Sequence, residues 1–366
     1  MKRILQVTLF DDKNIGNRLQ NYALQEVLIK KECEVTNLRD RRVYHISGKQ
    51  LIKNNVKHIL SITGNKKYKQ KYEASRFINA RWKIIHHFSE EYIHHIIDAS
   101  KGIDKIELSN YDLAIVGSDQ VWHNWKAGDP DFVMDLSYYY LSFLPPEKRA
   151  AYGASFGFDK FPERDLQAHM NGLQGMHYIS CREQSGCDLV QSVTGKDVPH
   201  VLDPTLLMDT SDWRKLESKA NAYSKNVTGK YAFVFFLGNE TEEYKQSVER
   251  ECKKNSIDTI IDFNDFSDDN IASCGPIEFL YLIDHAQYVF TDSFHCTVFS
   301  ILFEKNFVIY RRQQDGFTNM FGRIEELLKM TGHINNAYGG VSDRTEVEDF
   351  EIIKRRSLDY LDLILK

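Results

Sequence analysis

Two parts of the chain alternate short apolar runs with longer amphipathic segments, and this alternation constrains the fold more than any other feature. The first part starts with the apolar run at residues 4–9, continues with a helical stripe of apolar residues at 23–28, and reaches another apolar run at 35–38. The second part starts at residues 231–237 and repeats the pattern up to residues 287–291. Strand–helix–strand units of this kind build parallel sheets that bind ligands beyond the carboxyl ends of the strands. We therefore expect an α/β protein with two sheet domains that face each other across a cleft.

The length of 366 residues also favours two domains, because one hydrophobic core usually serves only about 100–200 residues. We assign residues 1–210 to the first domain, 231–345 to the second and 346–366 to a C-terminal helix that could pack on either. Residues 211–230, rich in Ser, Asn and Lys, are predicted to be the hinge region. Further strands are predicted at residues 111–119, 149–156, 177–181, 200–202, 259–263 and 307–310.

Residues 39–83 interrupt this alternation, because they are rich in Lys and Arg and contain few acidic residues. We predict a basic helical insertion over residues 39–100, with helices at 50–60 and 68–92. Two interpretations remain open for its basic face. It is either an ordinary solvated helix surface, or a surface for anionic lipid or for an acceptor that carries pyrophosphate.

Composition describes a globular protein, with 42% hydrophobic residues, 27% charged residues and a net charge of −5. This balance does not favour nucleic acid as a partner. The first apolar run reaches Asp11 and Asp12 too early to form a signal peptide or a membrane span, so we expect a cytoplasmic protein. The six cysteines are scattered without the spacing of a metal site, and no metal ligand is predicted.

The motif TDSFH at residues 291–295 joins an apolar strand to an apolar helix through a polar turn. Backbone N–H groups at the helix start, the Ser293 hydroxyl and the His295 imidazole would then face the cleft, which suits anion binding and proton transfer. A structural role, with the imidazole bonded to a carbonyl oxygen, is the alternative for His295.

Two more strands end in polar residues. Asp119 follows an apolar run and precedes Gln120 and Trp122, a combination that could bind the hydroxyls and the apolar face of a sugar. Arg182 follows another predicted strand and could clamp a phosphate or a carboxylate. Helix capping by Asp119 and a structural pairing of Arg182 with Glu183 are the competing explanations.

The P-loop motif, the dinucleotide-binding GxGxxG motif after the first strand and the GxSxG nucleophile elbow are all absent from the sequence. These absences remove the usual support for three common enzyme classes. The remaining hypothesis is an enzyme whose cleft carries the polar side chains described above.

Six motifs in this order resemble the polysaccharide pyruvyl transferase family, over roughly residues 4–328. They are NIGN (14–17), GSDQVW (117–122), YGASFG (152–157), SCREQSG (180–186), VLDPTLL (201–207) and TDSFH (291–295). The resemblance implies a fold similar to the GT-B glycosyltransferases, with two Rossmann-like domains facing across a cleft. It also implies transfer of pyruvate from phosphoenolpyruvate onto a sugar as a ketal, with no metal or nucleotide cofactor.

The resemblance also assigns residues. It places the essential histidine of the family at His295 and its arginine at Arg182, with Asp119 in the first-domain motif. The other candidate substrate-binding residues are Asn14, Gly16, Asn17, Gly117, Ser118, Gln120, Trp122, Asp292, Ser293 and Arg323. Two positions depart from the family pattern, because Cys296 stands where many members have Gly and Asn306 where Pro is usual.

The implied reaction gives these residues roles. We expect His295 to act as acid or base, Arg182 to clamp an anion, and Asp119 to orient a sugar hydroxyl or serve as a partner base. The second domain would lie on the donor side of the cleft. The insertion would lie on the acceptor side and suggests a lipid-linked oligosaccharide acceptor, with the enzyme resting on the anionic inner membrane face. A GT-B nucleotide-sugar glycosyltransferase and a non-catalytic glycan-binding protein are the alternatives.

Overall fold

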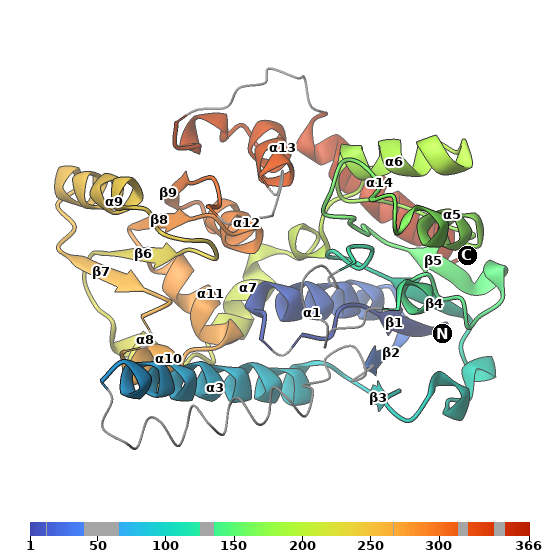
Figure 1. Cartoon of the computed structure of the whole chain (residues 1–366), viewed down its shortest axis with the longest axis horizontal. Coiled ribbons are helices and arrows are strands. Elements are labelled where there is room, and N and C mark those ends of the chain that lie inside the picture. The colour runs from blue at the N-terminus through green and yellow to red at the C-terminus, as the bar shows by residue number, and fades with distance from the viewer. Residues whose placement is uncertain (12, 40–65, 125–134, 266, 314–320, 340–347) are drawn as a thin grey trace.

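A computed structural model describes residues 1–11, 13–39, 66–124, 135–265, 267–313, 321–339 and 348–366. The chain forms two parallel sheets, which lie on opposite sides of the molecule with helices between and around them (Figure 1). The predicted α/β fold with two parallel sheets is therefore confirmed.

The first sheet has the strand order β3-β2-β1-β4-β5. Its strands are β1 (Arg3–Val7), β2 (Glu34–Arg39), β3 (Ile96–Asp98), β4 (Leu113–Val116) and β5 (Arg149–Ala151). Val7 at the end of β1 pairs with Leu38 on one side and with Val116 on the other, so these three strands end at the same edge. Residues that follow them are thereby brought together.

The second sheet has the strand order β7-β6-β8-β9. Its strands are β6 (Tyr231–Phe235), β7 (Thr259–Asp262), β8 (Tyr288–Thr291) and β9 (Asn306–Ile309). All five residues of β6 are buried, which explains its continuous apolar sequence, since a central parallel strand is covered on both faces.

Helices cover both sheets. The named α-helices are α1 (Ile15–Lys30), α3 (Lys66–Tyr92), α4 (Leu136–Tyr139), α5 (Leu166–Gln174), α6 (Gln184–Thr194), α7 (Thr210–Glu217), α8 (Ala222–Asn226), α9 (Glu242–Lys254), α10 (Asp269–Ala272), α11 (Pro276–Asp284), α12 (Phe294–Leu302), α13 (Gly322–Met330) and α14 (Phe350–Ile364). After the second sheet, the chain returns to the first sheet, where α14 packs. The Tyr360 hydroxyl of α14 donates to the Ala151 carbonyl of β5 at 2.8 Å.

Some predicted elements differ from the structure. Residues 177–181 and 200–202 form only isolated bridges rather than strands, and β5 ends before Gly153, whose φ of +55° leaves the extended region. The segment predicted as a hinge, 211–230, contains α7 and α8, and its Trp213 is fully buried against Phe299 at a ring distance of 4.9 Å. Its polar composition reflects the outer faces of short helices.

The basic insertion also differs in part. Its predicted helix at 68–92 is present as α3, but Ile96–Asp98 forms the edge strand β3 by pairing with β2. The predicted helix at 50–60 lies outside the described residues. Figure 1 shows α3 running beside α1 and beside α10, so one helix contacts elements of both halves.

Candidate active site

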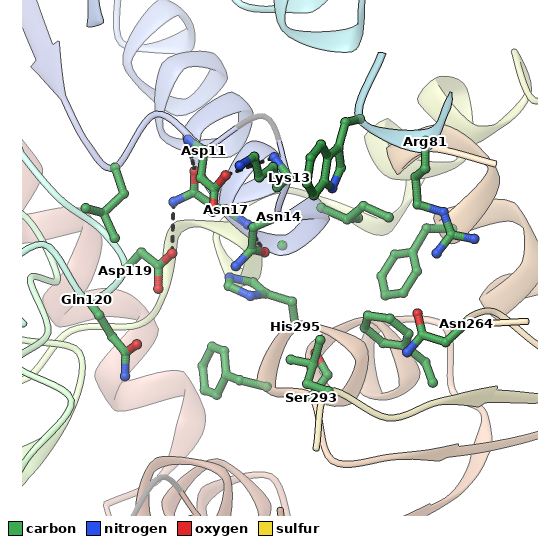
Figure 2. A pocket seen from close by; sticks show the side chains of 18 of the residues that line it. Asp11, Lys13, Asn14, Asn17, Arg81, Asp119, Gln120, Asn264, Ser293 and His295 are labelled. Atoms are coloured by element: carbon green, nitrogen blue, oxygen red, sulfur yellow. Dashed lines mark hydrogen bonds between the residues drawn. The ribbon is translucent and has the colours of Figure 1, made fainter. Parts of the chain in front are cut away.

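A pocket of about 570 Å³ lies between the two halves, beyond the carboxyl ends of β1, β4, β6 and β8. It is lined by the loop before α1, by residues after β4, by the start of α12 and by one face of α3. Figure 2 shows His295 near its centre, with Asp119 and Gln120 on one side and Arg81 and Asn264 on the other. This placement agrees with the general rule for ligand sites in parallel sheets.

His295 enters the pocket from the first turn of α12. The Ser293 side chain caps this helix by accepting the Cys296 N–H at 3.5 Å, and the preceding strand β8 is fixed by its neighbours β6 and β9. The imidazole packs directly on Gly16 at the start of α1, where an added Cβ would stand 2.3 Å from His295 Nδ1. Only glycine therefore allows α1 and α12 to approach with the imidazole between them.

The imidazole of His295 is available for proton transfer. Its Nε2 has no hydrogen-bond partner among the described residues, and the nearest acidic oxygen, Asp203 Oδ2, lies 3.9 Å away. Burial lowers the pKa of His295, although the negative charges of Asp203 and Asp119 oppose this shift. The side chain is therefore mainly neutral at pH 7 and can accept a proton.

Arg182 is the centre of a buried ion cluster. Its guanidinium donates to Asp203 at 2.7 Å, to Glu183 at 3.1 Å and to Asp119 at 3.2 Å. Burial opposes its charge, but the three carboxylates together raise the pKa of Arg182. Its side chain is 1% exposed and does not line the pocket. The prediction that Arg182 clamps an anionic substrate is therefore revised, because each of its three nitrogens already donates to a carboxylate and the side chain does not reach the pocket.

Asp119 reaches the pocket from the turn after β4. Its Oδ2 accepts the side-chain N–H of Asn17 at 2.9 Å, as Figure 2 shows. Burial alone would raise its pKa, but the positive charge of Arg182 and the proximity of His295 lower the pKa of Asp119 to about 2. The carboxylate is thus ionised at neutral pH and can accept hydrogen bonds, whereas it cannot serve as an acid.

In the part of the chain that the structure describes, two arginines that line the pocket have nitrogens without a hydrogen bond, although Arg312 Nε lies 3.6 Å from the Asp292 carboxylate. Arg323 Nε and Nη1 and Arg312 Nε have no hydrogen-bond partner among the described residues, and all three atoms are buried. Burial and the charge of Arg182 lower the pKa of Arg323 to about 10, so it still carries its charge at pH 7. Asp292 compensates the charge of Arg312, whereas Arg323 forms no ion pair among the described residues. A buried cation such as Arg323 is costly without a compensating anion, and it indicates a site where an anion binds.

The remaining predicted residues divide into two groups. Asn14, Gly16, Asn17, Gln120, Ser293 and Arg323 line the pocket. Asn14 also caps α1 by accepting the Asn17 N–H at 3.1 Å. The second group comprises Gly117, Ser118, Trp122 and Asp292, which do not line it.

These four residues lie behind the pocket lining and support it. Ser118 donates to Asp203 at 3.0 Å, and Gly117 takes a φ of +123° in the turn that delivers Asp119. Trp122 is fully buried, and its indole N–H donates to the Tyr139 carbonyl at 3.1 Å, so it does not stack on a sugar. Asp292 accepts the backbone N–H groups of Leu237 and Gly238 and so fixes the loop after β6.

Sequence reasoning missed several residues in or behind the pocket. Asp203, which lies 3.9 Å from His295 behind the pocket lining, follows the short buried run 200–202 just as Asp119 follows β4, and that parallel was a usable signal. Arg312 also follows a strand, β9. The contribution of Arg81 and Trp82 from α3 had no such signal, because it depends on where an insertion packs.

One group of potential metal ligands lies elsewhere. Among the described residues, Glu217, Asp284 and His285 place ligand atoms within 4.8 Å of one another. Asp284 already accepts a hydrogen bond from Arg214 at 2.8 Å and lies 3.9 Å from Lys305. These cations compensate its charge, and the group does not line the pocket.

Residues 14–314 match the family model described as polysaccharide pyruvyl transferase. No curated protein matches the chain. Among solved structures, the UDP-GlcNAc 2-epimerase of Methanocaldococcus jannaschii has 13% identity and a TM-score of 0.50, with 100% of this chain and 93% of that chain covered. The corresponding enzyme of Neisseria meningitidis has 10% identity and a TM-score of 0.43, with 100% and 93% covered. Similarity to the first shows the fold alone, which is GT-B-like.

Within the part of the chain that the structure describes, every helix is too short or too polar to cross a bilayer.

Proposed function

Because the chain belongs to the polysaccharide pyruvyl transferase family, we propose that it transfers pyruvate from phosphoenolpyruvate onto two hydroxyls of one sugar, as a ketal. The sugar would belong to a surface polysaccharide or to its lipid-linked precursor. The observation that carries this proposal is the unpartnered His295 imidazole in a pocket that also holds an ionised carboxylate and two buried guanidinium groups. The imidazole can transfer protons, the carboxylate can accept a hydrogen bond from a sugar hydroxyl, and the guanidinium groups can bind an anion.

The reaction needs one group that moves protons. A sugar hydroxyl attacks C2 of phosphoenolpyruvate while the C3 methylene gains a proton and becomes a methyl group. His295 takes the hydroxyl proton and returns a proton to C3, a cycle that suits a side chain that is neutral at rest. The second hydroxyl then displaces phosphate from C2, and its proton leaves with the phosphate.

The donor also brings negative charge. Its carboxylate and its phosphate would face Arg323, whose Nε and Nη1 lack partners among the described residues, and Arg312, whose Nε lies 3.6 Å from Asp292. The N-terminus of α12, where Ser293 lies in the pocket, adds backbone N–H groups and the positive end of the helix dipole. These groups would stabilise the departing phosphate and the charge that develops at C2.

Asp119 would bind the acceptor. Its ionised carboxylate accepts a hydrogen bond from Asn17 and retains acceptor capacity toward the pocket. A sugar hydroxyl that donates to Asp119 would be held beside His295 for attack. Arg182 acts as a positioning residue in this scheme, because it fixes Asp119 and Asp203.

The test is an incubation with phosphoenolpyruvate and a panel of hexoses, hexose 1-phosphates and lipid-linked oligosaccharides, with phosphate release and product mass as readouts. Phosphate release that depends on a sugar, with a product that carries a ketal, supports the proposal. Consumption of a nucleotide sugar with phosphoenolpyruvate untouched would show a glycosyltransferase instead. Sugar binding without turnover of either donor would show a glycan-binding protein.

We also propose that the protein works in the cytoplasm at the inner membrane face, where a lipid-linked acceptor is presented. The basic composition of residues 39–83 supports this proposal, and part of that segment lies outside the described residues. Co-sedimentation with vesicles tests it: binding should rise with the content of anionic lipid and fall when the lysines are neutralised. Binding that is independent of both would contradict it.

A further inference from the structure

The pocket extends well past the groups that the proposed reaction uses. Figure 2 shows Arg81 and Asn264 across His295 from Asp119, so the pocket continues on that side. The pocket there is bounded by α3 and by the loops after β6 and β7, with apolar contributions from Ile78, Trp82, Phe279 and Leu237. Phosphoenolpyruvate is far smaller than 570 Å³, so this side has room for a second molecule.

The wall formed by α3 is held in place. The Arg81 guanidinium donates to the Ile271 carbonyl at 2.8 Å and lies 4.3 Å from the Phe263 ring centre. Close by, a Cβ on Gly275 would stand 2.6 Å from Ile84, so α3 and the start of α11 are in tight contact. Further along α3, Phe88 packs edge-on against Tyr22 of α1 at 6.1 Å. Because α3 is anchored on both halves, its pocket face is a preformed binding wall.

Trp82 is the aromatic group of that wall. It is half-buried and lines the pocket, unlike Trp122 and Trp213, which are fully buried. The ammonium of Lys13 lies 4.3 Å from its ring centre. An indole at a pocket rim offers the flat apolar surface that the C–H face of a pyranose requires.

Lys13 gives this surface a charge. The residue is exposed and lines the pocket, and its ammonium takes part in no ion pair among the described residues. The adjacent Asp11 accepts the backbone N–H of Lys13 at 2.9 Å, which orients the loop without engaging the ammonium. A flexible lysine over an indole is a weak contact that a ligand can replace.

We propose that Trp82 and Lys13 form the acceptor subsite, and that the acceptor is a glycosyl phosphate. The pyranose ring takes the place of the ammonium on the indole, and the ammonium turns to the phosphate on the anomeric carbon. The same ring then presents its hydroxyls toward His295 and Asp119. This assignment rests on the proposed function for the reaction that follows, whereas the binding itself requires no donor.

The experiment measures binding to the full chain by calorimetry, without phosphoenolpyruvate, for free hexoses, hexose 1-phosphates, UDP-hexoses and a short-chain polyprenyl pyrophosphate hexose. At least one phosphorylated form should bind about tenfold more tightly than its free hexose. A preference among the three phosphorylated forms identifies the natural carrier. Failure of every phosphorylated sugar to bind overturns the proposal.

Variants then assign the contacts. Trp82→Ala should weaken binding of the free and phosphorylated sugars alike, about tenfold, while Trp82→Phe should restore most of it. Lys13→Met should remove only the advantage of the phosphate. Lys219→Met is the matched control and should change nothing, because Lys219 is exposed, lies 4.6 Å from the Tyr92 ring centre and does not line the pocket. An advantage of the phosphate that survives in Lys13→Met contradicts the proposal.

Turnover separates this inference from the proposed function. In the pyruvyl transfer assay, Trp82→Ala and Lys13→Met should raise KM for the acceptor and leave KM for phosphoenolpyruvate unchanged. Active enzyme with an unchanged acceptor KM in both variants overturns the subsite alone. Absence of pyruvyl transfer, together with sugar phosphate binding that depends on both residues, overturns the proposed reaction and retains the subsite.

Discussion

Gly16 and His295, which belong to different halves of the molecule, are in direct contact: a Cβ on Gly16 would stand 2.3 Å from His295 Nδ1 and 2.9 Å from its Cβ. Gly16 lies in the first turn of α1 and His295 in the first turn of α12. The two helices thus bring the NIGN and TDSFH motifs together, and the position of the imidazole depends on the relative placement of the two sheets.

Gly16→Ala should therefore displace the imidazole. We expect kcat to fall about 10- to 100-fold, because a small misplacement of a reacting group is costly. Steady-state phosphate release measures it. Gly172→Ala is the control, since its Cβ would meet the Tyr140 ring at 2.2 Å outside the pocket. That variant should lose stability with little change in kcat, and equal kcat losses in both would contradict a specific role of Gly16.

The activity should depend on the charge around His295. Burial lowers its pKa, and only the neutral imidazole accepts a proton, so the fall of kcat/KM at low pH should lie below the ordinary histidine value of about 6.5. The negative charge of Asp203 raises the pKa of His295. Asp203→Asn should therefore move this acid limb to lower pH, and a limb that moves upward or stays in place would contradict the assignment.

Removal of Arg182 should cost stability. Arg182→Met leaves three buried carboxylates without their cation, and we expect a loss of about 3–5 kcal/mol in the free energy of unfolding in urea. Contact with Arg182 lowers the pKa of Asp119 in the folded protein to about 2. The stabilisation from this ion pair is therefore present above the ordinary aspartate pKa of about 3.9 and is lost as the pH falls toward 2. The difference between wild type and variant should accordingly shrink at low pH.

An exposed ion pair provides the comparison for this prediction. Arg214 pairs with Asp284 at 2.8 Å, but its side chain is 55% exposed. Arg214→Met should cost less than about 1 kcal/mol. If both variants lose the same small amount, Arg182 is not the structural centre of the cluster.

Arg323 should behave in the opposite way. Its buried charge has no hydrogen-bond partner at Nε and Nη1 among the described residues, so Arg323→Met should leave the free energy of unfolding unchanged or raise it. The same variant should raise KM for phosphoenolpyruvate about tenfold or more, since the donor loses a cation. Arg312→Met should also raise KM for phosphoenolpyruvate. A stability loss with unchanged KM would place Arg323 in the fold rather than in the site.

The sequence predicted the parts of the fold that depend on local pattern. The strands other than β3, and the polar turns after β4 and β8, follow from short apolar runs and the polar residues that end them, whereas β3 lies in the segment predicted as a helical insertion. The runs at 177–181 and 200–202 did not form strands, because burial alone does not provide a pairing partner along their length. The packing of α14 on the first sheet depends on tertiary contacts and was left open.

The site was predictable to the same extent. Spacing indicates which residues follow a strand, so His295, Asp119 and Asn17 were found. It does not indicate which charges face one another, and Arg182 therefore seemed available although three carboxylates surround it. Similarly, the sequence contains several tryptophans, and only the docking of α3 decides that Trp82 rather than Trp122 reaches the pocket.

The central claim is that His295 moves the proton in pyruvyl transfer from phosphoenolpyruvate, and turnover in D₂O tests it most directly. The wild-type product should carry one deuterium in the ketal methyl group, by mass and NMR. His295→Gln should lower kcat about 10²- to 10⁴-fold, with binding of phosphoenolpyruvate retained. A wild-type rate in His295→Gln, or a sugar-linked product without deuterium in its methyl group, would contradict the account.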